Sequence, residues 1–314
     1  MTCSVLLPVY NGGVLLRLAV DSILKQDDPD FELLLIDDCS TDGSAQIIRR
    51  YAASDVRIRA IYHRRNAGLA GTLNEGLAEA RTDLVVRMDQ DDVALAGRVG
   101  AQVTFMRERP EVAVAGTFVY HMGASPAYDH LVQLPTGHDE IVSTLQRENC
   151  IYHPSVIMRR QQILSLGGYR PEFRNSEDYD LWLRVARVSR LANLPEPLLR
   201  YRFSVDGMTL GRKWEQALYT RMAVISNRDP ERSLDEVRQE AAMELERQGK
   251  GWFLEQVARG TILELIRLRL AGQAWRVLWT FSRQLDRGRV LPLVRDFAAA
   301  LLRTYLPGTG EARA

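Results

Sequence analysis

Apolar and polar positions alternate through the first ninety residues in a repeating order of short apolar runs and amphipathic stretches. The apolar runs end in polar loops and predict strands at 3–9, 31–37, 56–62 and 84–88. The amphipathic stretches between them predict helices at 13–25, 42–53 and 69–80. This order is typical of parallel strands joined by crossover helices.

The remaining chain falls into two parts with different patterns. Between 95 and 205 the pattern is mixed and predicts helices near 97–109 and 178–188 and strands near 112–120, 155–158 and 198–203. Strand signals stop after residue 205, and residues 212–306 are helix-like almost throughout. We therefore expect an α/β domain over 1–205, with a mixed, mainly parallel sheet flanked by helices, and a helical C-terminal region over 206–314.

Composition narrows the class of protein. The 314 residues are 46% hydrophobic and 26% charged, which is ordinary for a globular protein, and the net charge of +1 argues against a nucleic-acid binder. Three cysteines without a CxxC pair indicate neither a disulfide framework nor a zinc cluster. The first residues lack the basic region and small-residue cleavage site of a signal peptide, so we expect no export. No apolar run reaches the roughly 18–20 residues that span a bilayer. We expect a cytoplasmic protein, soluble or peripheral on the membrane.

The polar loops after the predicted strands are the first candidates for a site. In open α/β sheets, ligands bind at the carboxyl ends of the strands. Three loops occupy such positions: 10–12, 37–40 and 89–92. We expect these loops to converge.

An acidic cluster, Asp89-Gln90-Asp91-Asp92, follows an apolar strand. Side chains two apart on an extended segment point the same way, so Asp89 and Asp91 can reach one ligand while Gln90 points elsewhere. Carboxylate oxygens suit Mg²⁺ or Mn²⁺, which commonly bind together with phosphate oxygens. A solvated turn is the alternative, and the position after a buried strand favours the metal site.

Two adjacent acids, Asp37 and Asp38, stand at the end of the second predicted strand. Ser40 or Thr41 could cap the following helix, but this does not account for Asp37 and Asp38. Either carboxylate could accept hydrogen bonds from a nucleobase imide or a ribose hydroxyl.

A third acidic group, Glu177, Asp178 and Asp180, lies in the first turn of a predicted helix. The helix dipole favours ionised carboxylates there, and a general base must be ionised. The alternative is that these acids serve only to complement the charge of the helix end.

Five segments together closely resemble glycosyltransferase family 2. They are Ser4–Gly12, Ile36–Ser44, Asn66-Ala67-Gly68 with Asn74-Glu75-Gly76, Asp89–Asp92, and Ser176–Trp182. The resemblance covers about residues 1–205 and implies a GT-A fold, a Mn²⁺ or Mg²⁺ ion and inversion at the anomeric carbon. It further implies a hexosyltransferase that uses a nucleotide-diphosphate sugar, with UDP favoured. The implied acceptor is a hydroxyl of a glycan or lipid-linked molecule, as in bacterial cell-surface polysaccharide synthesis.

The resemblance also implies roles for single residues. Pro8, Tyr10, Asn11 and Asn66 are similar to donor-binding residues, Asp38 to the acid that binds uracil, and Asp89 to the acid near the ribose. Asp91 matches the metal ligand and Asp178 the general base. His153, Glu177 and Trp182 are acceptor-side candidates, although helical spacing favours the core for Trp182. Two positions depart from the family pattern: Ser204 stands near the place of a frequent His, and Cys39 stands where a Gly or Asn is frequent.

Two further observations concern the C-terminal region and the histidines. Residues 256–303 hold nine arginines against three acids, a surplus of +6 within amphipathic helices. Such helices can lie on an anionic membrane surface, and packing on the catalytic domain or a homodimer interface is the alternative. The other histidines have no metal-ligand spacing and are expected to be surface or structural residues: His63, His121, His130 and His138.

Two other functions compete with glycosyl transfer. A sugar nucleotidyltransferase would need a basic, Gly-rich loop after the first strand, whereas residues 8–14 contain no Lys or Arg. A non-catalytic scaffold in polysaccharide assembly is the other alternative. The presence of Asp38, Asp89, Asp91 and Asp178 argues against it.

Overall fold

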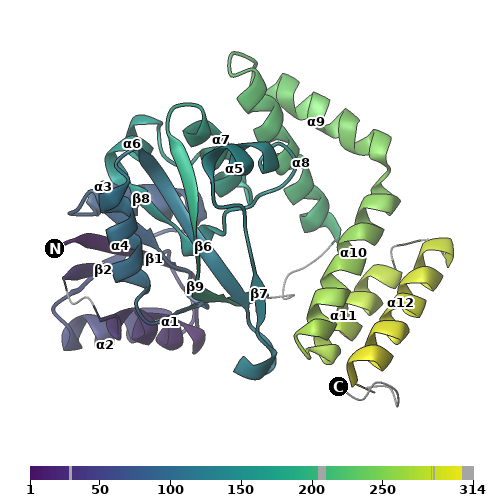
Figure 1. Ribbon diagram of the computed structural model, residues 1–314, viewed down its shortest axis with the longest axis horizontal. Helices are drawn as coiled ribbons and strands as arrows, with labels where there is room; N and C mark the ends of the chain where they lie inside the picture. The colour runs from purple at the N-terminus through teal and green to yellow at the C-terminus, as the bar shows by residue number, and fades with distance from the viewer. Residues whose placement is uncertain (28–29, 204–209, 284, 286, 306–314) are drawn as a thin grey trace, which may run out of the picture. The chain divides into compact units, whose positions relative to one another are not determined.

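The computed structural model describes residues 1–27, 30–203, 210–283, 285 and 287–305 (Figure 1). The chain forms two compact units. The first, called the sheet unit, comprises residues 1–120 and 131–202, and the second, called the helical unit, comprises 121–130 and 203–314. The boundary expected at 205–206, like Ser204, lies outside the described residues.

The described part of the chain contains a nine-stranded mixed sheet in the order β3-β2-β1-β4-β8-β6-β9-β5, with β7 beside β6. The strands are β1 Cys3–Val9, β2 Phe31–Asp37, β3 Ile58–Tyr62, β4 Leu84–Arg87, β5 Val93–Ala94, β6 Val112–His121, β7 His130–Val132, β8 Ile157–Arg159 and β9 Arg190–Tyr201. β1 pairs in parallel with β2 and β4, and β2 pairs in parallel with β3. β8 is antiparallel to both β4 and β6. The expected mixed α/β architecture is confirmed.

Helices cover both faces of the parallel part of the sheet. In the sheet unit they are α1 Leu15–Leu24, α2 Ser44–Ser54, α3 Gly68–Glu79, α4 Arg98–Glu108, α5 His138–Thr144, α6 Arg160–Ser165 and α7 Glu177–Ala186. Val5 and Leu7 of β1 share one core cluster with Leu16 of α1 and Val103 of α4. Leu6 points to the opposite face, where α3 approaches so closely that Gly76 has no room for a Cβ. Because β1 is parallel to both β2 and β4, the carboxyl ends of these three strands lie at one edge of the sheet.

The main differences from the expected elements lie in the second half of the sheet unit. β9 begins at Arg190, whereas the sequence predicted a strand only from about 198. The prediction started too late because Pro195 and Pro197 interrupt the apolar pattern, although the strand is continuous. β5, β7, α5 and α6 are too short to produce a periodic signal and were not expected.

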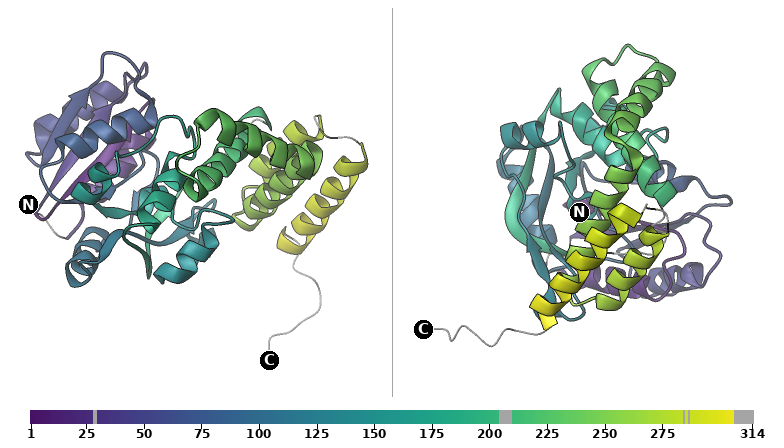
Figure 2. Two further views of the ribbon diagram at one scale, coloured as in Figure 1. Left: turned by 90° about the horizontal axis from the view of Figure 1, so that it is seen from above. Right: turned by 90° about the vertical axis from the view of Figure 1, so that its right-hand side faces the viewer.

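The helical unit contains α8 Leu210–Arg228, α9 Leu234–Gln248, α10 Lys250–Arg267, α11 Ala271–Ser282 and α12 Arg287–Tyr305. Ser233 and Glu236 form a reciprocal capping box at the start of α9. Helices α10, α11 and α12 run alongside one another (Figure 2) and share a core that includes Leu265, Phe281 and Phe297. Within the described ranges, none of the helices combines the length and the apolar character that crossing a membrane requires.

Candidate active site

A cavity of about 710 Å³ opens in the sheet unit at the carboxyl ends of β1, β2 and β4. Its size is within the usual range for small-ligand sites. It is lined by six residues that the family resemblance assigns to the donor or metal: Pro8, Tyr10, Asp38, Asn66, Asp89 and Asp91. Pro171, Arg174, Asn175 and Glu177 line it as well. The structure therefore brings the three predicted loops together with the start of α7.

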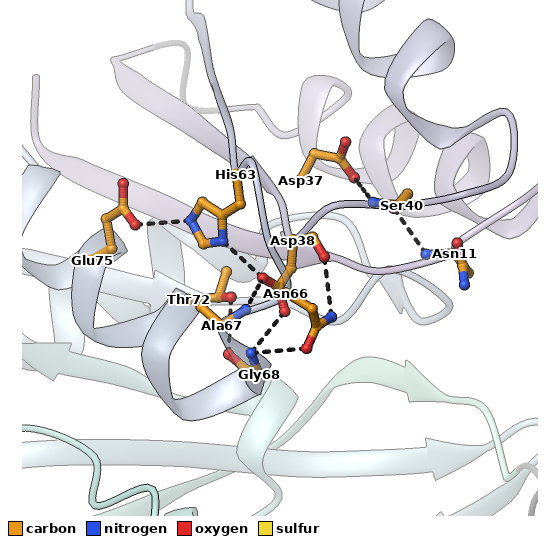
Figure 3. A network of polar contacts seen from close by, with 10 residues as sticks. All are labelled: Asn11, Asp37, Asp38, Ser40, His63, Asn66, Ala67, Gly68, Thr72 and Glu75. Carbon is orange, nitrogen blue, oxygen red and sulfur yellow. Dashed lines mark hydrogen bonds and ion pairs between the residues drawn. The ribbon is translucent and has the colours of Figure 1, made fainter.

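Asp38 is the centre of a network of polar contacts at the end of β2 (Figure 3). Its Oδ1 accepts a hydrogen bond from the backbone N–H of Ala67 at 2.6 Å and lies 2.8 Å from His63 Nδ1. Its Oδ2 accepts a hydrogen bond from the N–H of Gly68 at 3.0 Å, and Asn66 Nδ2 donates to its carbonyl. These contacts fix the carboxylate of Asp38, which is only 4% exposed, at the wall of the cavity.

The Asn74-Glu75-Gly76 segment supports this network and the opposite wall. Glu75 Oε2 lies 2.8 Å from His63 Nε2, so the imidazole is held between two carboxylates. Asn74 makes paired hydrogen bonds with the backbone of Tyr169, donating to its carbonyl and accepting from its N–H, both at 2.8 Å. Gly76 gives α3 its close approach to Leu6. Each residue of the segment has a distinct structural task.

The turns around the cavity adopt unusual backbone conformations. Asn11, Cys39 and Asn175 all have positive φ angles, of 53°, 62° and 60°. Non-glycine residues rarely adopt this left-handed region, and Asn tolerates it better than most. Cys39, half-buried, is the least suited of the three. Asn11 does not line the cavity; it braces the turn, accepting a hydrogen bond from the N–H of Thr41 at 2.8 Å.

The acidic cluster after β4 crowds three carboxylates into a partly buried position. Burial and the charge of Asp89 raise the pKa of Asp91 and raise that of Asp92 well above its ordinary value. Oδ1 of Asp92 accepts a hydrogen bond from the N–H of Arg202 at 2.7 Å, but its buried Oδ2 has no hydrogen-bond partner among the described residues. An orphaned carboxylate oxygen within crowded acids fits a divalent cation.

Two fully buried arginines stand behind these acids. Arg87 places Nη2 2.6 Å from Asp89 Oδ1, and its positive charge favours the ionised forms of Asp91, Asp92, Glu177 and Asp178. Arg98 donates to the carbonyls of Arg87 and Pro154, and burial lowers its pKa to about 9. Buried charge costs free energy unless it is paired, so these arginines depend on the acids in front of them.

The three acids in the first turn of α7 have three different environments. Glu177 lines the cavity, and burial followed by the charge of Asp178 raises its pKa to about 7. Asp178 is half-buried and does not line the cavity; its Oδ2 accepts a hydrogen bond from Asn149 Nδ2 at 2.9 Å. Asp180 is buried and pairs with Arg170 and Arg184. It is therefore a structural residue.

The helix dipole was expected to favour ionised acids at the start of α7. Burial acts in the other direction and is the largest cause of the raised pKa of Asp178, as it is for Glu177. A raised pKa makes each carboxylate a stronger base once ionised.

His153 and Trp182 lie behind the site and not on its wall. Trp182 is fully buried, which confirms the expected core position. Its ring packs edge-on against His153, whose Nε2 lies 2.9 Å from the hydroxyl of Tyr169. Burial and then the charge of Arg87 hold the pKa of His153 well below its ordinary value, so this imidazole is neutral.

Sequence reasoning missed four polar residues of the site. Gln90 makes contacts described below, Arg174 lines the cavity, and Arg202 Nε donates to the carbonyl of Asp91 at 2.9 Å. Arg87 is the fourth. Arg87 and Arg174 stand two residues before recognised segments, but only the fold shows that Arg87 and Arg202 contact the acidic cluster.

Comparisons with known proteins agree with this geometry. The model of the family "Glycosyl transferase family 2" matches residues 4–167. The O-antigen biosynthesis glycosyltransferase WbnJ of Escherichia coli is 33% identical over 205 residues, which are 63% of this chain and 78% of the relative. Among solved structures, S. aureus TarS 1–349 in complex with UDP has a TM-score of 0.57 at 18% identity and covers 97% of this chain and 89% of its own. The mannosyltransferase PcManGT of Pyrobaculum calidifontis, in complex with GDP-Man and Mn²⁺, has a TM-score of 0.58 at 16% identity, with coverages of 97% and 81%.

The family match spans more than half of the chain, and the likeness to the two solved structures supports the GT-A fold. The expected family and fold are confirmed. This chain belongs to glycosyltransferase family 2.

Proposed function

We propose that this chain is an inverting hexosyltransferase of bacterial cell-surface polysaccharide synthesis. It moves a sugar from a nucleotide-diphosphate donor, with UDP favoured, to a hydroxyl of a glycan or lipid-linked acceptor. One observation carries the proposal: the acids after β2 and β4 and the first acid of α7 line one cavity. The O-antigen role in the name of the Escherichia coli relative and the UDP bound to TarS support it.

The donor binds at the ends of β1 and β2. The carboxylate of Asp38 is fixed by two backbone N–H groups and is positioned to accept a hydrogen bond from the uracil imide. Tyr10 is 48% exposed at the cavity wall and offers a ring face to the base. Arg174 supplies a cation on the opposite wall for the diphosphate.

The acids after β4 form the metal site. Asp91, with Asp92 beside it, would hold Mn²⁺ or Mg²⁺, which when bound offsets the charge of the diphosphate leaving group. Oδ2 of Asp92, which is buried behind the lining residue Asp91 and has no hydrogen-bond partner among the described residues, is a further oxygen close to this site. Asp89, paired with Arg87, is left to contact the ribose.

Asp178 acts as the general base and removes the proton from the acceptor hydroxyl as that oxygen attacks the sugar. Its raised pKa favours proton uptake, and its hydrogen bond from Asn149 orients the carboxylate. Glu177, on the cavity wall, positions the acceptor through a hydrogen bond and is the next candidate for the base.

The enzyme works at the cytoplasmic face of the membrane, held there by the helical unit. Trp275 and Trp279 of α11 are 56% and 53% exposed, and the guanidinium of Arg283 lies 4.3 Å from the ring centre of Trp279. Exposed tryptophans beside arginines are typical of helices that lie in the membrane interface. A homodimer interface is the alternative use of the same surface.

Calorimetric titration of UDP with and without Mn²⁺ tests the donor site. Wild type should bind UDP more tightly when Mn²⁺ is present, and Asp91→Asn should lose that gain. Asp139→Asn, which alters an exposed acid of α5, should keep it and serves as the control. If wild type and Asp91→Asn both bind UDP equally well with and without Mn²⁺, the proposed metal-assisted donor site is contradicted. A scaffold protein would bind no nucleotide in either condition.

A further inference from the structure

A second group of candidate metal ligands belongs to the helical unit. His121 ends β6, His130 begins β7, and Glu264 lies in the last part of α10. Oε1 of Glu264 is 2.8 Å from Nδ1 of His121 and 3.0 Å from Nδ1 of His130. One ligand atom from each residue lies within 4.8 Å of those of the other two. Glu264 is more than 130 positions from either histidine in sequence, yet its carboxylate lies beside both imidazoles.

The loop between the histidines is shaped to hold them side by side. Gly123 approaches the carbonyl of Tyr128 so closely that no side chain fits there. Asp129 accepts a hydrogen bond from the N–H of Gly123 at 3.0 Å and closes the loop on itself. The N–H of Ala124 donates to the carbonyl of Leu268 at 2.9 Å, just beyond α10. The backbone therefore holds the loop that carries both histidines against the end of α10 before any ion binds.

The surroundings favour an ionised carboxylate and restrict water. His121 is buried, and the ring of Phe203 lies 5.6 Å from its ring, centre to centre. Burial alone would raise the pKa of Glu264, but the hydrogen bonds from the two imidazoles lower it to about 2. The carboxylate of Glu264 is thus held ionised between the two imidazoles.

We propose that His121, His130 and Glu264 form a zinc site that fastens the loop 121–130 to α10. Two imidazole nitrogens and one carboxylate oxygen are a ligand set that Zn²⁺ commonly takes, with a water molecule as the fourth ligand. A tetrahedral ion with bonds of about 2.0–2.1 Å separates its ligand atoms by about 3.3 Å. The contacts of 2.8 and 3.0 Å must therefore open by about 0.5 and 0.3 Å when the ion binds.

Among the described residues, Arg267 is a cation close enough to two of these ligands to compete with the ion. Its Nη1 lies 3.1 Å from Nε2 of His130 and 3.4 Å from Oε2 of Glu264. Zinc on Nδ1 leaves Nε2 of His130 protonated, which removes the acceptor for Arg267. The Arg267 side chain is 58% exposed and can turn into solvent. The arginine therefore competes with the ion, and its removal should favour zinc.

The test is zinc binding to the full chain after EDTA treatment, measured by competition with a chromophoric chelator. We expect one site that survives in Asp91→Asn, which separates it from the proposed donor site. His121→Asn and Glu264→Gln should each weaken zinc binding at least tenfold, since even the loss of a group that supports a ligand costs about that much. His138→Asn, a histidine of α5, is the matched control and should leave the affinity unchanged.

A second variant separates a metal site from a simple ion-pair cluster. Arg267→Gln should bind zinc as tightly as wild type or more tightly, because it removes a competing cation. The proposal is overturned if His121→Asn and Glu264→Gln bind zinc within twofold of wild type, or if the binding disappears only in Asp91→Asn. Should these variants fail to fold, the wild type decides: Co²⁺ should give the visible absorption of a four-coordinate site, and its absence would overturn the proposal.

Discussion

The side-chain amide of Gln90 is bonded to both backbone groups of Tyr10. Its Oε1 accepts a hydrogen bond from the N–H of Tyr10 at 2.9 Å, and its Nε2 donates to the carbonyl of Tyr10 at 3.0 Å. The loop after β1, with the proposed base-binding Tyr10, is thereby fastened to the loop after β4, with the proposed metal ligand Asp91. Gln90, whose side chain was expected to point elsewhere, couples the two halves of the donor site.

Gln90→Ala should therefore weaken UDP binding in the presence of Mn²⁺ by about tenfold, since two hydrogen bonds of about 1 kcal/mol each no longer hold Tyr10 in place. The free energy of unfolding should fall by no more than about 2 kcal/mol. Calorimetry and urea unfolding measure the two quantities. Gln90→Glu keeps the acceptor but loses the donor, and should lie between wild type and Gln90→Ala. Unchanged UDP affinity in Gln90→Ala would contradict the coupling.

Cys39 offers a prediction about stability alone. Its φ of 62° lies in the left-handed region, which costs an ordinary residue roughly 1–2 kcal/mol. Glycine avoids this cost but loses more entropy on folding, roughly 0.5–1 kcal/mol. Cys39→Gly should thus raise the free energy of unfolding by about 0.5–1 kcal/mol, and Cys39→Val should lower it. A destabilised Cys39→Gly variant in urea unfolding would show that thiol packing dominates at this position.

The parallel half of the sheet was predictable from sequence because its signals are local. Buried strands such as Phe31–Asp37 are mostly apolar, and the acids at their carboxyl ends follow directly in sequence. The convergence of those ends follows from parallel topology. The positive φ at Cys39 is a conformation that Gly and Asn adopt more readily than other residues.

The missed features depend on contacts between distant positions. No local pattern indicates that Gln90 reaches Tyr10, that Asp180 pairs with Arg170 and Arg184, or that His121 meets Glu264.

The surplus of positive charge predicted for residues 256–303 was also incomplete, because it left out an acid that lies outside the stretch. Arg259 and Arg289 both pair with Glu255, which lies just outside the basic stretch 256–303, so part of the expected surplus is neutralised.

Glu177 predicts a dependence of stability on pH. Its pKa in the folded protein is raised to about 7 from an ordinary 4.5, so the folded state retains a proton that the unfolded state releases. This group therefore lowers stability as pH rises from about 4.5 to 7, by up to about 3 kcal/mol. Glu177→Gln should be more stable than wild type at pH 8, and the difference should shrink toward zero near pH 4.5. Urea unfolding at both pH values in EDTA tests this, and a difference independent of pH would contradict it.

The membrane prediction concerns α11. Wild type should sediment with vesicles containing anionic lipid and be released by salt, because attraction to the surface falls off within a Debye length of about 10 Å at 0.1 M salt. Replacing Trp275 and Trp279 by Ala should reduce binding. Trp252→Ala, at another exposed tryptophan, is the matched control. Salt-insensitive or absent binding by wild type would favour a packing or dimer role for the surface.

Transfer by Asp178→Asn is the most direct test of the central claim that these acids perform glycosyl transfer. Single-turnover kinetics with a UDP-sugar and a lipid-linked acceptor should show a product of inverted configuration from wild type. Asp178→Asn should bind UDP normally but transfer about 10²–10⁴ times more slowly, the usual contribution of a general base. An unchanged rate in Asp178→Asn, or a product that retains the donor configuration, would contradict the account.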